Sequence, residues 1–189
     1  MRLGVVILTL LLMHGTVAWS ATTELPQHFG KLTLGAPLSS SLRSEMEPQN
    51  ANSHGIFSPR EPFARVLCRA ISQALDCENI SALIYTHHDA VVGVDFSFYG
   101  KRYPDLVKSL SSVYGKPKIK NILDPDPTGV HLRKWIWRDE NSTLYVIAVP
   151  ESPAQLKTND RSGIPHVVIR HNKLYEPYRK ALDNQYHEQ

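Results

Sequence analysis

The sequence has only two cysteines, little net charge and no long hydrophobic run after its first 20 residues. The apolar run at 3–13 is shorter than the roughly 20 residues that cross a bilayer, so no membrane-spanning helix is expected. Without residues 1–20, which carry only Arg2, 20 basic residues remain against 18 acidic residues, and they form no basic block. This balance gives no reason to expect a nucleic-acid-binding protein.

The N-terminus has the layout of a secretory signal peptide. A positive charge at Arg2 precedes the apolar run, and the small residues Ala18 and Ser20 follow it. We predict a signal peptide over 1–20 with cleavage after Ser20. No cysteine stands at the cleavage site, so a lipid anchor is not expected. The remaining chain, 21–189, is predicted to be a single domain that is soluble and periplasmic or secreted.

The two cysteines, Cys68 and Cys77, both lie in the part predicted to be exported, where oxidation is the default. In one straight helix, residues nine positions apart are separated by about 13.5 Å. Bridged cysteines have Cα atoms within about 7 Å of each other. Either the segment 68–77 bends back and forms a disulfide, as we predict, or the thiols remain free. Their spacing differs from Cys-x-x-Cys, which argues against redox catalysis.

Alternating hydrophobic residues predict two hairpins. Residues 90–98 alternate with period two, and residues 80–86 are predicted to form the partner strand. A second hairpin pairs 130–138 with 143–149 across a turn at 139–142. The segment 166–170 is predicted to be a further strand.

The sequence also predicts an amphipathic helix and a long polar loop. Leu106, Leu110 and Val113 form an apolar stripe within 102–117, and an amphipathic segment closes the chain. The stretch 45–62 is rich in Pro, Asn, Ser and Gly, so a long polar surface loop is expected there. Together these elements predict an α+β fold, an antiparallel sheet of hairpins packed against one or two amphipathic helices.

The second hairpin carries the candidate binding face. A turn at 139–142 pairs Trp137 with Leu144, so that Trp135 and Trp137 share an apolar face. This arrangement favours a core position for the two tryptophans over an aromatic platform for sugar or peptide. The opposite face mixes basic, apolar and aromatic side chains and is the better candidate for contacting a partner. Its predicted residues are Lys134, Ile136, Arg138, Tyr145 and Ile147.

The run His87-His88-Asp89 is either a polar turn or part of a metal site. It lies where the first hairpin must reverse, and polar residues favour such turns. His131, His166 or His171 could complete a metal site, although the helical spacings typical of zinc ligands are absent. The turn is the favoured interpretation. No nucleophile elbow, phosphate-binding loop or dinucleotide fingerprint occurs, and no cofactor is expected.

Two short motifs carry a resemblance. FGKLTLGAPL at 29–38 and LVKSLSSVYGKP at 106–117 contain Leu-Gly-x-Pro-Leu and Tyr-Gly-x-Pro. With these segments the chain resembles small exported bacterial proteins of unassigned function. The resemblance covers about a third of the chain, and it implies export and the fold rather than an activity.

Two classes of function remain open. The favoured hypothesis is an exported, non-enzymatic binding or accessory protein of the bacterial cell envelope, such as an adaptor, an inhibitor or an immunity protein. Its partner would be another exported or envelope protein. The alternative is a small periplasmic hydrolase or metal-dependent enzyme that uses the 87–89 turn with residues from the 124–131 or 151–166 loops.

Overall fold

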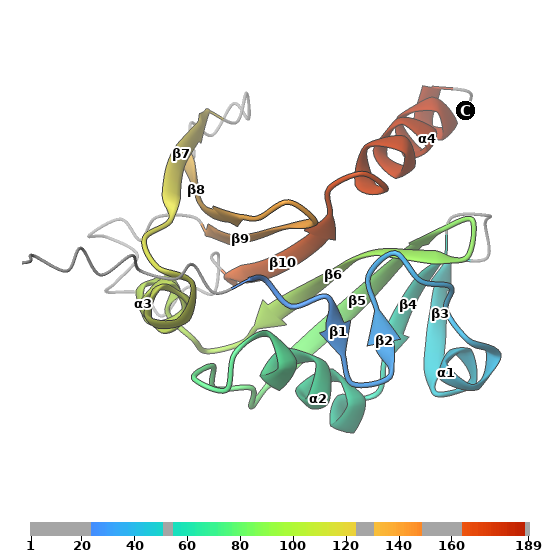
Figure 1. Cartoon of the computed structure of the whole chain (residues 1–189), viewed down its shortest axis with the longest axis horizontal. Coiled ribbons are helices and arrows are strands. Elements are labelled where there is room, and N and C mark those ends of the chain that lie inside the picture. The colour runs from blue at the N-terminus through green and yellow to red at the C-terminus, as the bar shows by residue number, and fades with distance from the viewer. Residues whose placement is uncertain (1–23, 51–54, 124–130, 149–163, 188–189) are drawn as a thin grey trace, which may run out of the picture.

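A computed structural model describes residues 24–50, 55–123, 131–148 and 164–187, which form one large antiparallel sheet, a small hairpin and four helices (Figure 1). The sheet contains β3 (Met46–Asn50), β4 (Ile56–Pro59), β5 (Ile80–His87), β6 (Ala90–Phe98), β7 (Lys118–Leu123), β8 (His131–Arg138), β9 (Ser142–Ala148) and β10 (His166–His171). The small hairpin pairs β1 (His28–Phe29) with β2 (Leu32–Thr33). The helices are α1 (Ser40–Ser44), α2 (Glu61–Ile71), α3 (Tyr103–Tyr114) and α4 (Tyr175–His187). The predicted α+β class is confirmed.

The sheet joins two groups of four strands at its centre. Its order is β3-β4-β5-β6-β10-β9-β8-β7, and every pair is antiparallel. Helix α3 leads the chain from β6 to β7 at the far edge, and β10 returns to the middle between β6 and β9. Strands distant in the sequence therefore become neighbours at β10.

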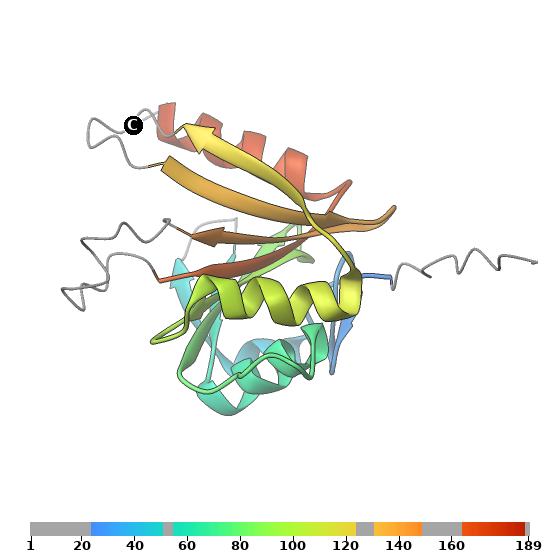
Figure 2. The ribbon, with the colours of Figure 1, turned by 90° about the vertical axis from the view of Figure 1, so that its left-hand side faces the viewer.

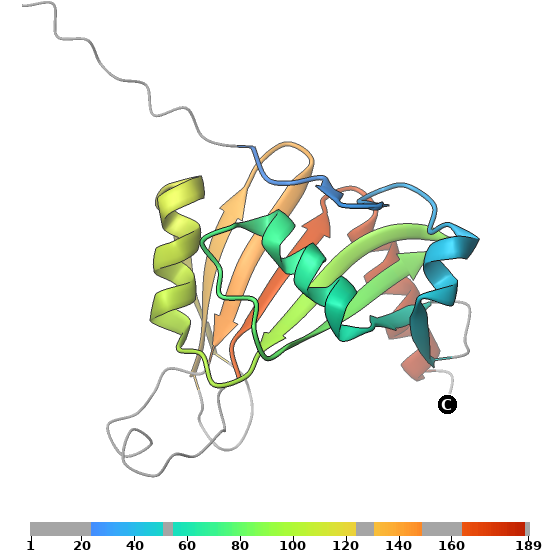
Figure 3. The ribbon, with the colours of Figure 1, turned by 90° about the horizontal axis from the view of Figure 1, so that it is seen from below.

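Helices cover the two faces of the sheet unequally. Figure 3 shows α2, α3 and the β1–β2 hairpin on one face, which we call the core face. Helix α4 lies on the other side of the twisted sheet, as Figure 2 shows, and we call that side the second face. The core face holds the large apolar side chains, among them Ile84, Val94, Phe96, Leu144, Val146, Val167 and Ile169.

The β5–β6 hairpin and helix α3 match their predictions. Strands β5 and β6 pair from Ile80 opposite Phe98 to His87 opposite Ala90. In α3 the buried residues are Leu106, Leu110 and Tyr114. Gly115 ends the helix with φ of 75°, a left-handed value that glycine adopts without the clash of a Cβ.

The second hairpin has the predicted register. Arg138 lies opposite Thr143, and Trp137 lies opposite Leu144. Trp135 and Trp137 are only 6% and 5% exposed on the core face. The Trp135 ring stacks on Tyr103 with centroids 5.0 Å apart, and the Trp137 indole N–H donates to the carbonyl of Gly115 at 2.8 Å. These contacts confirm that the tryptophans belong to the core.

The predicted disulfide between Cys68 and Cys77 is present, with Cα atoms 6.0 Å apart. Helix α2 ends at Ile71, so the following residues turn back toward the helix instead of extending it. Both cysteines are buried in the core. The bridge therefore fixes the return of the chain from α2 into β5.

The expected loop at 45–62 is instead largely regular structure. It contains β3, β4 and the start of α2, with β3 antiparallel to β4. Pro48 is compatible with β3 because this strand lies at the edge of the sheet and has only one neighbour. Strand β7, at the opposite edge, was also not predicted.

The predicted signal peptide, 1–20, lies outside the described residues. Within the described part, no helix is both long and apolar enough to cross a membrane. The Leu-Gly-x-Pro-Leu motif connects β2 to α1 through Gly35, whose φ is 82°. The backbone N–H of Gly35 donates to the carbonyl of Val91, which attaches this connection to β6.

Candidate binding face

The five residues predicted to bind a partner belong to the second face of the sheet. Lys134 lies opposite Ile147, and Ile136 lies opposite Tyr145. Lys134, Ile136 and Ile147 are half-buried, whereas Arg138 is exposed. Tyr145 is only 1% exposed, so it forms the floor of this face and does not project from it.

Strand β10 adds a residue that sequence reasoning missed. Arg170 lies opposite Thr143 of β9 and Gly93 of β6. A Cβ at Gly93 would come within 3.0 Å of the carbonyl oxygen of Ile169 and 3.4 Å of Arg170 Cγ. The absence of a side chain at this position therefore makes room for the arginine stem.

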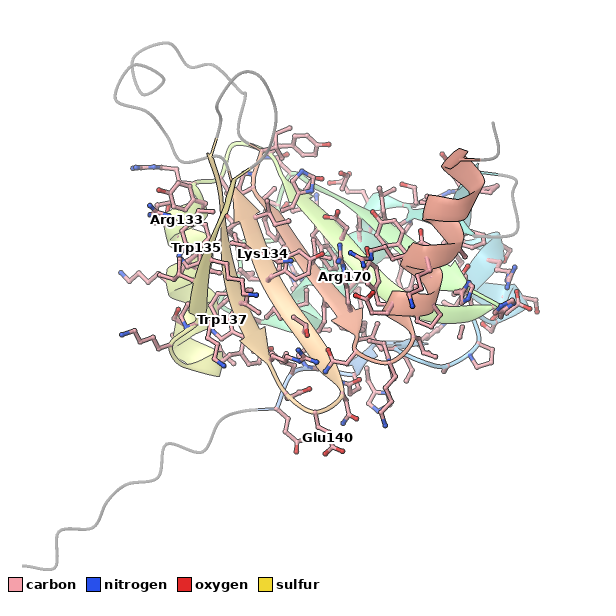
Figure 4. All side chains as sticks on the ribbon, turned by 90° about the horizontal axis from the view of Figure 1, so that it is seen from above. Arg133, Lys134, Trp135, Trp137, Glu140 and Arg170 are labelled. Carbon is pink, nitrogen blue, oxygen red and sulfur yellow. A yellow bond between two sulfur atoms is a disulfide. The ribbon has the colours of Figure 1, made fainter. Side chains whose placement is uncertain are left out.

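Two cations share the ring of Tyr145. Lys134 Nζ lies 3.5 Å from the ring centroid, and the guanidinium carbon of Arg170 lies 4.6 Å from it. The Arg170 guanidinium also lies over the Tyr175 ring of α4, at 3.7 Å. We call these four residues the basic-aromatic cluster; Figure 4 shows Lys134 and Arg170 on the side of the sheet that carries α4.

The surroundings of Lys134 disfavour its charged form. Burial, reinforced by the charges of Arg170 and Lys120, lowers the pKa of Lys134 to about 8. Among the described residues, no carboxylate forms an ion pair with Lys134 or Arg170. Both cations instead make cation–π contacts with the tyrosine rings.

Two polar atoms of the cluster lack partners. The Tyr145 hydroxyl and Arg170 Nε are buried and form no hydrogen bond within the described residues. Burial raises the pKa of Tyr145, as expected for a phenol removed from water. A buried polar group without a partner costs about 1–3 kcal/mol, so such a group in a folded protein calls for an explanation.

One acidic residue on this face already has a partner. Asp95 lies opposite Val168 of β10, and its Oδ1 is 3.0 Å from His166 Nδ1. The hydrogen bond with Asp95 raises the pKa of His166. Ser97 Oγ lies 3.4 Å from the same ring nitrogen. A catalytic triad needs the acid and the serine on different ring nitrogens, so this group does not have that geometry.

Aromatic residues close the α4 end of the face. Tyr178 is buried, and its ring centroid lies 6.0 Å from that of Tyr85 and 5.7 Å from that of Tyr175. Burial raises the pKa of Tyr85 and of Tyr175. Tyr178 lies on the apolar side of the amphipathic C-terminal segment, but no sequence pattern placed it beside Tyr85.

His88 and Asp89 form the turn between β5 and β6, and His87 is the last residue of β5, opposite Ala90. His88 and Asp89 have φ values of 47° and 66°, as in the two-residue turns that match the twist of a hairpin. Asp89 forms an ion pair with Arg43 of α1, and the two histidine rings lie 4.1 Å apart. No group of three or more potential metal ligands occurs in the described ranges.

The other histidines considered for a metal site lie elsewhere. His166 pairs with Asp95, and His171 Nδ1 accepts from the backbone N–H groups of Lys173 and Leu174. The ring of His131 and the loops 124–130 and 151–163 fall outside what the structure describes. The turn therefore joins β5 and β6 to α1, and among the described residues it forms no ligand group with His166 or His171.

Comparison with known proteins finds no matching family model, no similar curated protein and no similar solved structure. The structure itself defines the chain as an α+β protein whose sheet carries a basic and aromatic surface on its second face.

Proposed function

We propose that this chain is an exported, non-enzymatic binding or accessory protein of the bacterial cell envelope, such as an adaptor or an inhibitor. It binds another exported or envelope protein through the second face of its sheet. The basic-aromatic cluster supports this proposal because it holds two cations without a carboxylate partner in the described part of the chain. Aromatic residues and arginine are typical of the centres of protein interfaces.

Two features support export. The first 20 residues have the composition of a signal peptide. The disulfide between Cys68 and Cys77 fits an oxidising compartment, because structural disulfides persist mainly outside the cytosol. Intact-mass analysis of the secreted protein should give a chain that begins at or near Ala21, and recovery of a chain that retains residues 1–20 contradicts export with cleavage.

Site-specific photo-crosslinking tests the binding face. A photoreactive amino acid replaces Ile136 on the second face or, as a control, Val66, which is 50% exposed on α2 across the sheet. Neither replacement changes the charge. The purified variants are irradiated in an extract of exported proteins from the source organism, with and without excess unlabelled protein.

The expected result is a discrete crosslinked product from position 136 that excess unlabelled protein removes and that position 66 does not give. Identical products from both positions, or products that the competitor leaves unchanged, contradict the assignment of the second face.

A further inference from the structure

We propose that Lys134, Arg170 and Tyr145 form a recognition site for carboxylate side chains in an extended acidic segment of the protein partner. This inference rests on the proposed function and specifies the chemistry of the segment that the second face binds. Lys134 and Arg170 come from β8 and β10, and both contact the ring of Tyr145 on the strand between them.

The unpaired polar groups of this site match what a carboxylate needs. A carboxylate accepts hydrogen bonds at both oxygens, and it forms stronger bonds with ammonium and guanidinium donors than with neutral ones. Arg170 Nε is a buried donor without a partner in the described residues. The Tyr145 hydroxyl, in a side chain that is 1% exposed, is a second unpaired group in the floor beneath the cations. Binding therefore requires the Lys134 and Arg170 side chains to move enough to uncover these two groups.

The charge around the site is also one-sided. The register places Lys120 of β7 directly opposite Lys134, and it places Lys118 opposite Ile136 on the same face. Arg138 continues the basic surface at the other end of β8. In the described strands the acids of this face are Asp95, which pairs with His166, and Glu47 on the distant edge strand β3. On α4, Glu176 pairs with Arg179. A negatively charged partner therefore complements this surface.

The width of the basic surface favours a peptide over a small anion. Lys120 and Arg170 lie on strands separated by three strand spacings, about 14 Å, and the register also offsets them by four residues along the strands. In an extended peptide, side chains on one side recur about every 6.6–6.8 Å. Acidic residues two and four positions apart can therefore reach Arg170, Lys134 and Lys120, whereas a single phosphate spans only one part of the row.

The distribution of exposed apolar residues does not suggest a lipid surface. In the described residues, the exposed large hydrophobic side chains are Val66, Tyr99 and Ile119. Val66 belongs to α2 across the sheet, and Ile119 lies opposite Trp135 on the core-face side of β7. Tyr99 follows the end of β6, where its hydroxyl hydrogen-bonds with Ser81. These positions form no apolar patch around Lys134 that could enter a membrane.

Calorimetric titration of the full mature chain tests the inference. The probes are a short synthetic peptide with glutamate at every second position and the same peptide with glutamine. The test variant combines Lys134→Gln with Arg170→Gln. Its matched control combines Lys108→Gln with Arg69→Gln, which removes one lysine and one arginine from exposed positions on α3 and α2.

We expect the glutamate peptide to bind the wild-type chain and the control with affinities within about twofold. The test variant should bind at least about tenfold more weakly, since a tenfold change needs only about 1.4 kcal/mol and one charge-assisted hydrogen bond contributes that much. The glutamine peptide should not bind detectably. If the double variant fails to fold, Lys134→Gln alone should weaken binding relative to Lys108→Gln.

Three results would overturn the inference. They are equal weakening by the test and control variants, equal binding of the two peptides, and site-dependent binding of inorganic phosphate or of phosphatidylglycerol vesicles without peptide binding. The crosslinking test separates these results from failure of the proposed function. A competed product from position 136 together with a negative peptide test refutes carboxylate recognition and leaves the binding face in place.

Discussion

The unpaired hydroxyl of Tyr145 leads to an unusual prediction, namely that removing a buried polar group stabilises the protein. Within the described residues this hydroxyl has no hydrogen-bond partner. An unsatisfied buried group costs about 1–3 kcal/mol, and replacement by phenylalanine removes that cost while leaving only a small void. We expect Tyr145→Phe to raise the free energy of unfolding by about 1 kcal/mol. The cations above the ring keep their contacts because the ring remains.

Tyr114 provides a matched control, because its hydroxyl is also buried but donates a hydrogen bond to the carbonyl of Ile71 at the end of α2. Burial raises the pKa of Tyr114 to about 12, so the hydroxyl is neutral over the range of the experiment. Tyr114→Phe removes the hydrogen bond and leaves the carbonyl without its donor. We expect it to lower the free energy of unfolding by about 1–2 kcal/mol.

Urea unfolding followed by tryptophan fluorescence measures both variants. The opposite signs should separate the two midpoints clearly, with unchanged m-values. The disulfide must remain intact during the experiment, because its reduction breaks two-state behaviour. A loss of stability in Tyr145→Phe as large as that in Tyr114→Phe would refute the reasoning, because it would mean that the Tyr145 hydroxyl does form a stabilising hydrogen bond.

Three further predictions concern charge, the disulfide and the β5–β6 turn. Lys134→Met should raise the free energy of unfolding at pH 7, because the folded state disfavours the lysine charge. Between about pH 8 and 10.5 the unfolded wild type binds more protons than the folded one, so the wild type gains stability and its difference from the variant shrinks. A difference in the free energy of unfolding that does not change with pH contradicts this prediction. Replacing Cys68 and Cys77 by serine should lower the free energy of unfolding by about 3 kcal/mol, and thiol labelling of the unfolded, unreduced wild type should find no free thiol. His88→Ala should change the free energy of unfolding by no more than about 0.5 kcal/mol. His87→Ala should lower it by about 1 kcal/mol, because the His87 ring contacts the Tyr178 ring edge-on. Stoichiometric zinc or copper that both substitutions remove would instead favour the enzyme hypothesis.

The sequence by itself determined the elements whose signals are local. Period-two alternation determines which side chains of a strand share a face, and it predicted β6 and both tryptophans in the core. The four-residue turn at 139–142 determined the register of β8 against β9 for the same reason. The apolar stripe of α3 was also sufficient, because it acts within about a dozen residues. The disulfide was predicted from the number of cysteines and the expected oxidising compartment, whereas their spacing left open whether the segment bends back.

The edge strands were beyond sequence reasoning. Pro48 and the polar residues around it indicate a loop, yet β3 tolerates them because an edge strand needs hydrogen bonds on one side only. In β7, Ile119 and Ile122 are an odd number of positions apart, so period-two alternation gives the strand no apolar face that the sequence could reveal. Exposed lysines on an edge strand also hinder pairing with another chain.

Only the tertiary structure decided the composition of the candidate site. The sequence placed Lys134 and Tyr145 on one face, but it gave no indication that Tyr145 is buried or that Arg170 lies beside it. That neighbourhood exists because β10 enters the sheet between β6 and β9, and α4 then brings Tyr175 over the arginine. The alternation within a strand is a local property, whereas the choice of neighbouring strands depends on how the whole apolar face is buried. For this reason the sequence could predict the side of the sheet on which a residue lies, and the fold alone determined which side chains meet there.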